Sequence, residues 1–401
     1  MAELIPFFIV LSAGILFSSV FNRLHLPWVI ALLLGGIIIG PTGFALFELN
    51  PTIDFLAEIG LVFLMFMAGL ELRFSNFKEV KNTVLRTATI NGLIPFFLGV
   101  SIGYLFGYDL IPSLLIGVIF ISSSIAVVIP SLEASGLIHA KLGQNIIAST
   151  MFQDVASLIL LSLLFQNTIQ ESPLPLPLFY LFLVIIIFVM RWVLPKVRWL
   201  FTRGIEKDKD VFQQELRTVF VLLIGTVLLF QVLGLHAIIG GFFAGFILSS
   251  SVTSKLLLGK LRAISYGLFI PIFFITVGVK TDFSALINVK GALALTFVIV
   301  SVSLCSKFLS GFLGGRVSGF SRDESAVIGV SSIPQLSTTL AVAFAGFETG
   351  LIDDSLVTAM VMLSIVTTFV GPLLIKYFTG RLSKKARIPV FSENTKISDT
   401  M

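Results

Sequence analysis

The sequence predicts an all-α polytopic membrane protein with 13 transmembrane helices, built as two six-helix inverted-topology repeats with crossed broken helices. Three observations predict this class: an apolar composition, closely spaced apolar segments and an internal repeat. The chain is 56% hydrophobic and only 12% charged, with a mean hydropathy of +1.04, which lies outside the range of ordinary soluble domains. In such a chain a net charge of +5 does not indicate a nucleic-acid partner, because the basic residues follow the membrane.

Apolar segments follow one another with short polar connections, and most approach the 20 or so residues that a transmembrane helix needs. This spacing leaves no room for a soluble domain, so we expect a membrane transporter domain at 1–380 and a disordered cytoplasmic tail at 381–401. The single cysteine, Cys305, lies within an apolar segment, which excludes a disulfide framework. The predicted spans are 4–21, 27–45, 54–72, 85–106, 111–132, 143–166, 178–200, 214–233, 236–251, 261–279, 291–315, 324–347 and 353–379.

Basic residues concentrate on one side of the predicted membrane. When the loops are assigned alternately to two sides, one side receives 24 of the 27 lysines and arginines. The other side receives only Lys280 and Lys290, and Lys307 belongs to neither because it lies within the span at 291–315. The positive-inside rule then puts the N-terminus outside and the C-terminus in the cytoplasm. We expect a multi-pass protein of the cell membrane, such as a prokaryotic inner membrane.

Short motifs from the first half of the chain recur in the second half, at an offset close to 209 residues. Copies separated by an odd number of helices are inverted relative to each other, an architecture frequent in secondary transporters, whose binding sites lie near the midplane. We therefore predict repeat 1 at about 4–166, a connecting helix at 178–200 and repeat 2 at about 214–379. The matching pairs are Trp28–Gly36 with Ala237–Gly245, Gly69 with Gly278, Phe74 with Phe283, Ser122–Val127 with Ser337–Val342, and Glu133 with Glu348.

The paired spans at 111–132 and 324–347 are poor continuous helices. Each combines a proline, Pro130 or Pro334, with clustered hydroxyl side chains in mid-membrane. Proline removes a backbone donor and clashes with the preceding turn, and hydroxyl groups can satisfy the backbone groups that a break releases. Matching interrupted segments indicate a transport site, although Ser and Thr also mediate close helix packing. The candidate cation-binding hydroxyl residues are Ser123, Ser124, Ser337, Thr338 and Thr339.

Asp154 is almost the only carboxylate deep inside an apolar segment. An ionised carboxylate there costs roughly 3 kcal/mol or more unless it finds a partner, so we predict that Asp154 binds Na⁺ or K⁺ and a proton in competition. A structural ion pair between helices is the alternative. Gln153 is the neighbouring candidate ligand, and a helix–helix hydrogen bond is the other role open to it. We expect neither enzymatic activity nor a cofactor, because the metal ion and the proton are the transported substrates.

Lys307 is the second charged residue inside an apolar span. Three roles are open to it: pairing with Asp154, holding a helix break, or snorkelling to the membrane interface. Glu133 falls at the end of the first interrupted span and is a candidate modulating charge.

The motif Phe152-Gln153-Asp154-Val155-Ala156 resembles the monovalent cation:proton antiporter superfamily, in its second, Kef/Nap-like branch. Kef-type potassium/proton antiporters carry a similar Phe-Gln-Asp-x-Ala core in the sixth helix, and sodium-exchanging relatives often have two adjacent aspartates there. The resemblance covers about residues 4–380. Further similarity lies in Ser122–Val127 with Glu133, Gly136 and Leu137, and in Phe273–Phe274 with Gly278, Asp282 and Phe283.

The resemblance implies a homodimer whose subunits each combine a dimerisation domain with a six-helix core domain that moves as an elevator. It implies that Asp154 binds the ion and the proton, in electroneutral exchange of one cation per proton. Lys307 matches a lysine that in two-aspartate relatives pairs with the first aspartate, which Gln153 replaces here. The sequence departs from the family at Ile333–Thr339, where many relatives have an Arg-Gly-Glu-type sequence. It also lacks the nucleotide-binding regulatory domain of full Kef proteins, so we do not expect glutathione-type gating.

Secondary exchange of Na⁺ or K⁺ for H⁺ is the leading hypothesis, and two alternatives stay open. A passive potassium channel is one, although the sequence contains no Thr-Val-Gly-Tyr-Gly filter. A sodium-coupled organic solute symporter of related broken-helix architecture is the other. The sequence does not decide between Na⁺ and K⁺, because selectivity depends on the number and spacing of oxygen ligands.

Overall fold

The computed structural model describes residues 4–23, 27–46, 50–71, 82–169, 213–233, 235–249, 254–282 and 288–386, with isolated positions at 189, 192, 193, 196, 252 and 284. Within these ranges the chain forms helices and no strands, in agreement with the all-α prediction. Nine of the described helical segments are long and apolar enough to cross a membrane, and two shorter apolar helices accompany them. The predicted span at 178–200 falls almost entirely outside the described residues, so the total of 13 stays a prediction.

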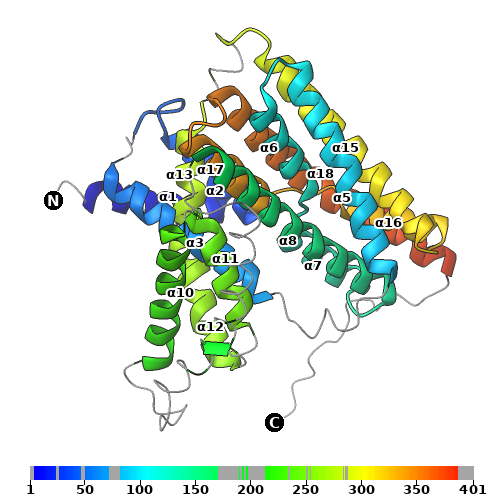
Figure 1. Ribbon diagram of the computed structural model, residues 1–401, viewed down its shortest axis with the longest axis horizontal. Coiled ribbons are helices and arrows are strands. Elements are labelled where there is room, and N and C mark those ends of the chain that lie inside the picture. Colours follow the sequence, from blue (N-terminus) through cyan, green and yellow to red (C-terminus); the bar gives the residue numbers. More distant parts are fainter. Residues whose placement is uncertain are drawn as a thin grey trace.

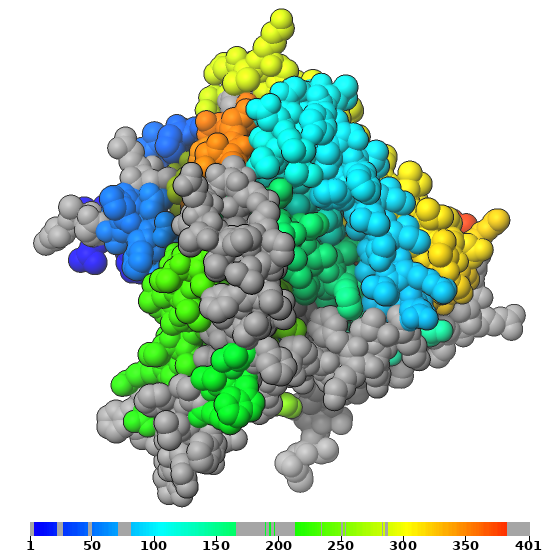
Figure 2. All heavy atoms as spheres, viewed as in Figure 1, coloured from blue at the N-terminus to red at the C-terminus, as the bar shows by residue number. Residues whose placement is uncertain are grey.

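The helices form two bundles that lie side by side (Figure 1). Figure 2 draws the same view as spheres, in which α10 (Gln214–Val232) covers part of the first bundle and α5 (Asn82–Leu105) covers part of the second. The first, which we call the flanking bundle, comprises α1 (Leu4–Arg23), α2 (Trp28–Ile39), α3 (Pro51–Glu71), α10 (Gln214–Val232), α11 (Ala237–Leu248), α12 (Lys255–Ile264), the π-helical turn η2 (Ser265–Phe269) and α13 (Ile270–Lys280). The second, the crossing bundle, comprises α5 (Asn82–Leu105), α6 (Leu110–Ile121), α7 (Ile125–Ala134), α8 (Lys141–Ile169), α15 (Ala292–Val317), α16 (Arg322–Ser331), α17 (Ser337–Glu348) and α18 (Asp354–Ala386).

Several predicted boundaries differ from the structure by a few residues, and two of these differences have a local explanation in the sequence. The span predicted to run to residue 45 ends at Ile39, because Gly40 precedes Pro41 and takes an extended conformation with ψ −179°; a residue before proline is disfavoured in the helical region. The last helix continues to Ala386, past the predicted domain end at 380. Residues 381–386 are mostly good helix formers, so polarity alone does not end the helix.

Glycine contacts let the helices of the flanking bundle approach closely. Gly278 of α13 lies against Gly36 of α2, where an added Cβ would collide with the Leu33 carbonyl oxygen and come 2.9 Å from the Gly36 Cα. Gly69 of α3 lies against Gly245 of α11 in the same way, with 3.1 Å from an added Cβ to the Gly245 Cα. Small residues at helix interfaces permit this backbone approach, which replaces the hydrophobic driving force that lipid does not supply.

The crossing bundle is packed through small and hydroxyl residues. An added Cβ at Gly99 of α5 would come 2.9 Å from the Gly117 Cα of α6, and one at Gly311 of α15 would come 2.9 Å from the Gly329 Cα of α16. At one end of this bundle the Tyr108 hydroxyl donates to both carboxylate oxygens of Asp353, at 3.2 and 3.3 Å. Burial, and then the charge of Asp353, raise the pKa of this phenol, so the hydroxyl stays protonated and available as a donor.

The two bundles contact each other at the end where α3 begins and α13 and α17 finish, which we call the Lys280 end. There α17 packs against α3, and the Phe273 and Phe344 rings of α13 and α17 lie 6.4 Å apart. The Thr358 hydroxyl of α18 donates to the Asp282 carbonyl oxygen at 3.2 Å. Among the described residues, these side-chain contacts join the bundles at that end.

Replacing Gly278 with alanine should destabilise the flanking bundle, because the new methyl group collides with the backbone of α2. We expect a loss of about 1–3 kcal/mol, as for other overpacked interiors, measured as a lower melting temperature of the purified protein in detergent. Gly225→Ala is the matched control, since nothing lies within 4 Å of a Cβ at that position of α10. Equal melting temperatures for the two variants would show that the α2–α13 contact is not tight.

Candidate ion-binding site at the crossed helix breaks

Both predicted helix breaks are present. The first span divides into α6, which ends at Ile121, and α7, which begins at Ile125. The second divides into α16, which ends at Ser331, and α17, which begins at Ser337. Pro334 lies within the second break, whereas Pro130 lies inside α7 and does not mark the first. The first break is therefore located by its three consecutive serines, Ser122–Ser124.

The two breaks contact each other and satisfy each other's backbone groups. The Ser124 backbone N–H donates to the Pro334 carbonyl oxygen at 2.6 Å, and the Ser123 hydroxyl donates to the Ser332 carbonyl oxygen at 3.0 Å. Ser122 and Thr339 share a hydroxyl–hydroxyl hydrogen bond of 3.2 Å. Unpaired backbone groups are costly in an apolar interior, so these bonds explain how two broken helices persist there.

Lys307 of α15 stabilises the end of α6. Its side chain is 0% exposed, and its ammonium group donates to the Ile121 carbonyl oxygen at 2.7 Å and to the Gln153 Oε1 atom at 3.4 Å. A positive charge is favourable at a helix C-terminus, where carbonyl groups lack helical partners. Of the three roles predicted for Lys307, the structure therefore shows the one at a helix break, and burial excludes snorkelling to the interface.

Gln153 and Asp154 lie on α8 beside the breaks. Gln153 accepts a hydrogen bond from the Ser123 hydroxyl at 3.3 Å as well as from Lys307, so its amide oxygen takes the helix–helix role. Asp154 follows it on the helix, is 9% exposed and interacts electrostatically with Lys307. The structure thus brings the carboxylate and Lys307 into one buried polar centre.

The other predicted site residues divide between this centre and the surface. Ser124 immediately precedes α7 and is 2% exposed, and its hydroxyl has no hydrogen-bond partner among the described residues. Thr338 and Thr339 are buried in the first turn of α17, and Ser337 is half-buried there. Glu133 is exposed near the far end of α7, about 12 Å along the helix from Ile125 at 1.5 Å per residue. It does not join the centre.

Two amide side chains, Asn91 of α5 and Gln335 within the second break, lie beside the candidate site although the sequence did not mark them as site residues. The Asn91 side chain of α5 donates to the Ser332 hydroxyl at 2.7 Å and accepts from the Ser310 hydroxyl at 2.8 Å. Gln335 donates to the Phe120 carbonyl oxygen at 3.5 Å and accepts from the Ser303 hydroxyl at 3.2 Å. The sequence offered one indication of this contact, because Asn91 is the single asparagine in the predicted apolar span at 85–106.

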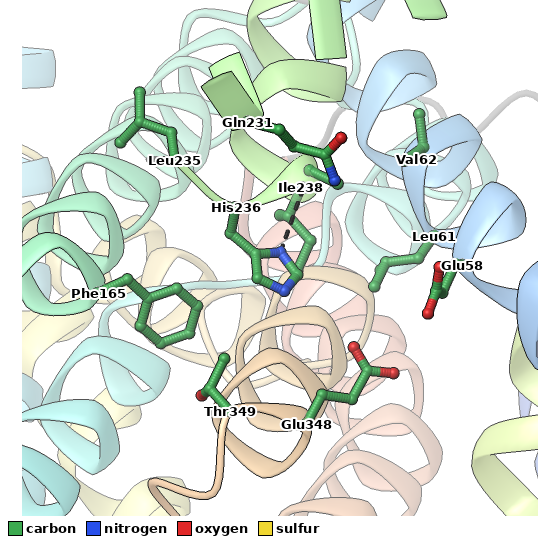
Figure 3. Close-up of a pocket in the computed structure, with 11 residues that line it drawn as sticks. Glu58, Leu61, Val62, Phe165, Gln231, Leu235, His236, Ile238, Glu348 and Thr349 are labelled. Carbon is green, nitrogen blue, oxygen red and sulfur yellow. Dashed lines mark hydrogen bonds between the residues drawn. The ribbon is translucent and has the colours of Figure 1, made fainter. Parts of the chain in front are cut away.

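A cavity of about 340 Å³ lies between the bundles near the Lys280 end (Figure 3). Glu58 of α3, His236 before α11 and Glu348 of α17 line it. The Ile238 backbone N–H donates to the His236 Nδ1 atom at 3.4 Å, and the His236 ring lies 5.5 Å from that of Phe165 at the end of α8. Asp154 does not line this cavity, so the cavity is distinct from the buried polar centre.

A buried carboxylate beside two interrupted helices, in a bundle of apolar helices, defines a secondary-transporter architecture. The sequence model of the transmembrane sodium/hydrogen exchanger family matches residues 7–379. The chain belongs to that family. Its members are transporters rather than enzymes, and the ions that they exchange are substrates, so no cofactor is required. The family match does not distinguish branches of the superfamily, so the assignment to the Kef/Nap-like branch stays a prediction.

Individual relatives agree with the family assignment. The chain is 32% identical over 386 residues to a protein of Methanocaldococcus jannaschii named "Probable Na(+)/H(+) antiporter 3", covering 95% of this chain and 98% of the relative. It is 27% identical over 367 residues to the "Na(+)/H(+)-K(+) antiporter GerN" of Bacillus cereus, covering 90% of this chain and 92% of that one. The solved structure of the sodium proton antiporter MjNhaP1 of M. jannaschii at pH 8 shares the fold, with a TM-score of 0.68 and 20% identity, over 96% of this chain and 99% of that one.

Replacing Lys307 with methionine should destabilise the protein, because the buried Ile121 carbonyl oxygen loses its donor. An unsatisfied buried acceptor costs about 1–3 kcal/mol, which we expect to exceed the relief from no longer burying an ammonium group. The measurement is the melting temperature of the purified protein. Lys290→Met is the control, since Lys290 is exposed before α15 and should change stability by less than about 0.5 kcal/mol. An unchanged or higher melting temperature for Lys307→Met would contradict this role.

Proposed function

We propose that this protein exchanges a monovalent cation, Na⁺ in the first instance, for H⁺, with Asp154 binding both in competition. The observation that carries the proposal is the position of Asp154, buried on α8 next to Gln153, whose oxygen is hydrogen-bonded to both the first break and Lys307. The names of the relatives as Na⁺/H⁺ antiporters support Na⁺ as the cation.

The chemistry follows from burial. An ionised carboxylate in an apolar interior is unstable unless a counterion or a proton neutralises it. A metal ion and a proton therefore exclude each other at Asp154, and either of them discharges the carboxylate for movement across the membrane. One carboxylate that carries one cation in one direction and one proton in the other gives electroneutral exchange.

Ser124 is the best-supported further ligand for the cation. Its hydroxyl is buried without a hydrogen-bond partner among the described residues, and its neighbour Ser123 is bonded to Gln153. Hard cations such as Na⁺ prefer neutral and anionic oxygen ligands. Thr338, across the contact between the breaks, is the second hydroxyl that we assign to the ion, whereas the Thr339 hydroxyl is engaged with Ser122.

The arrangement of the bundles supports alternating access by movement of the crossing bundle against the flanking bundle. Asp154 and both breaks belong to the crossing bundle, so they would travel together as an elevator. The glycine contacts also support two inverted repeats: Gly36 of the first copy meets Gly278 of the second, and Gly245 of the second meets Gly69 of the first. An axis that exchanges the two copies produces such reciprocal pairing. The resemblance of the sequence supports the proposed homodimer, and the distribution of basic residues among the loops supports an outside N-terminus and a cytoplasmic C-terminus.

Potassium is the second candidate cation, favoured by the name of the relative GerN, which includes K⁺. One experiment decides between them. Proteoliposomes that contain a pH-sensitive dye are loaded with acid, and proton efflux is followed after Na⁺, K⁺, Li⁺ or Rb⁺ is added over about pH 6 to 9. Efflux of equal strength with every cation would contradict a selective site.

Asp154→Asn should reduce cation-dependent proton efflux to the level of empty liposomes, because an amide neither titrates nor supplies a negative charge. Asp109→Asn is the matched control, since Asp109 is an exposed carboxylate that precedes α6 on the same bundle, and it should keep wild-type flux. Size-exclusion profiles and melting temperatures establish that both variants fold. Undiminished flux in folded Asp154→Asn protein would overturn the proposal.

Ser124→Ala should raise the apparent KM for the cation by roughly fivefold, which corresponds to the loss of one neutral oxygen contact, while maximal flux falls less. Ser101→Ala is the control, because Ser101 is exposed on α5 and its hydroxyl bonds only to the Phe97 carbonyl oxygen of its own helix. An unchanged KM in Ser124→Ala would remove Ser124 from the ligand set.

A further inference from the structure

Lys280, the last residue of α13, connects the two bundles. Its ammonium nitrogen lies 2.9 Å from the Asp54 Oδ1 atom of α3 and 3.9 Å from the Glu348 Oε1 atom of α17. Asp54 belongs to the flanking bundle, as Lys280 does, whereas Glu348 belongs to the crossing bundle. The Asp54 pair therefore stays within one bundle, and the Glu348 pair bridges the two.

Three carboxylates surround this lysine. Besides Asp54 and Glu348, Glu58 lies one turn along α3 and lines a small gap of about 10 Å³ together with Lys280 and Glu348. The charges of Lys280, Glu58 and Asp54 all act on Glu348. Lys280 attracts the carboxylate of α17 toward α3, and without that ammonium group the two acids of α3 would repel it.

The pair sits in a region where side chains of the two bundles meet. The Phe273–Phe344 ring contact lies on the same two helices, α13 and α17. The cavity lined by Glu58, His236 and Glu348 lies beside it (Figure 3). Figure 3 shows Glu58 and Glu348 reaching the same side of this cavity, from α3 and from α17. Any displacement of α17 away from α3 must separate Lys280 from Glu348 and widen this cavity.

We propose that Lys280 is a positioning residue that latches the bundles together at the Lys280 end. Asp54 anchors the lysine to the flanking bundle, and the Lys280–Glu348 pair opens each time the crossing bundle moves to expose Asp154 toward this end. The inference rests on the proposed alternating access. It adds a residue pair that shifts the equilibrium between the arrangement in which the bundles are in contact at the Lys280 end and the arrangement in which they are apart there. The charge distribution of the loops puts the Lys280 end outside the cell.

The test uses the accessibility of Leu61, which is 4% exposed and lines both the cavity and the small gap. Leu61→Cys is made in a Cys305→Ser background, and its modification rate by an uncharged methanethiosulfonate is measured in proteoliposomes. An uncharged reagent avoids direct effects of the altered charges. Lys280→Gln and Glu348→Gln should each raise the rate by roughly two- to fivefold, the range expected for a partly exposed ion pair in a two-state equilibrium.

The double variant Lys280→Gln/Glu348→Gln should exceed neither single variant, because all three lose the same interaction. Lys290→Gln is the control for removing a positive charge from this end and should leave the rate unchanged. Unchanged rates in both single variants, or effects that add in the double variant, would overturn the latch.

The same measurements in an Asp154→Asn background separate this inference from the proposed function. The Lys280–Glu348 pair is proposed to affect the equilibrium between the closed and open arrangements of the bundles in the absence of transport. The higher modification rate of Leu61→Cys in the Lys280→Gln and Glu348→Gln variants should therefore persist when transport is abolished. Persisting ion exchange in Asp154→Asn would overturn the proposed site while leaving the labelling result intact. If Asp154→Asn abolishes exchange but Lys280→Gln and Glu348→Gln leave the labelling rate unchanged, the latch alone would be overturned.

Discussion

The crossing bundle depends on one constraint: two interrupted helices in an apolar interior must satisfy each other's backbone groups. The Ser124–Pro334 and Ser123–Ser332 hydrogen bonds meet part of this requirement, and the Lys307 ammonium group meets another part at the end of α6. The position of Asp154 follows from the same bonds, because Ser123 and Lys307 also hold its neighbour Gln153. The bonds that keep the breaks intact therefore place the candidate ion-binding carboxylate.

The flanking bundle meets a different requirement with different residues. It contains no interrupted pair among its described helices, and its contacts depend on close backbone approach at Gly36, Gly278, Gly69 and Gly245. Such contacts tolerate little relative movement of the helices, since close-packed interiors resist deformation. Close glycine contacts occur in both bundles, whereas the buried polar centre belongs to the crossing bundle alone among the described residues. The flanking bundle is therefore suited to serve as a frame for the bundle that carries the site.

The sequence predicted those features that a local pattern reports. Clustered hydroxyl residues marked both breaks, together with Pro334 in the second, and a carboxylate in an apolar run marked Asp154. Pro130 did not mark the first break, because it lies inside α7 and its missing backbone N–H affects only that helix. The sequence left three roles open for Lys307, because a long side chain can reach several groups. Only the tertiary structure selects among them. Asn91 was missed for the opposite reason: one amide in an apolar helix does not reveal which helix it faces. Glu133 shared a repeat position with Glu348 but lies at the surface, because repeat symmetry matches positions rather than environments.

The separation of the two breaks along the chain has a consequence for biogenesis. Ser123 and Ser332 are 209 residues apart, so a ribosome completes the first break long before it reaches the second. Until α16 and α17 emerge, the serines of the first break lack the backbone partners that they have in the finished fold, and unpaired groups in hydrocarbon cost several kcal/mol each. Residues 110–134 therefore reach their final conformation only after nearly the whole chain has been inserted. Truncation before residue 322 would leave the early helices in the membrane without the structure that makes them a transporter.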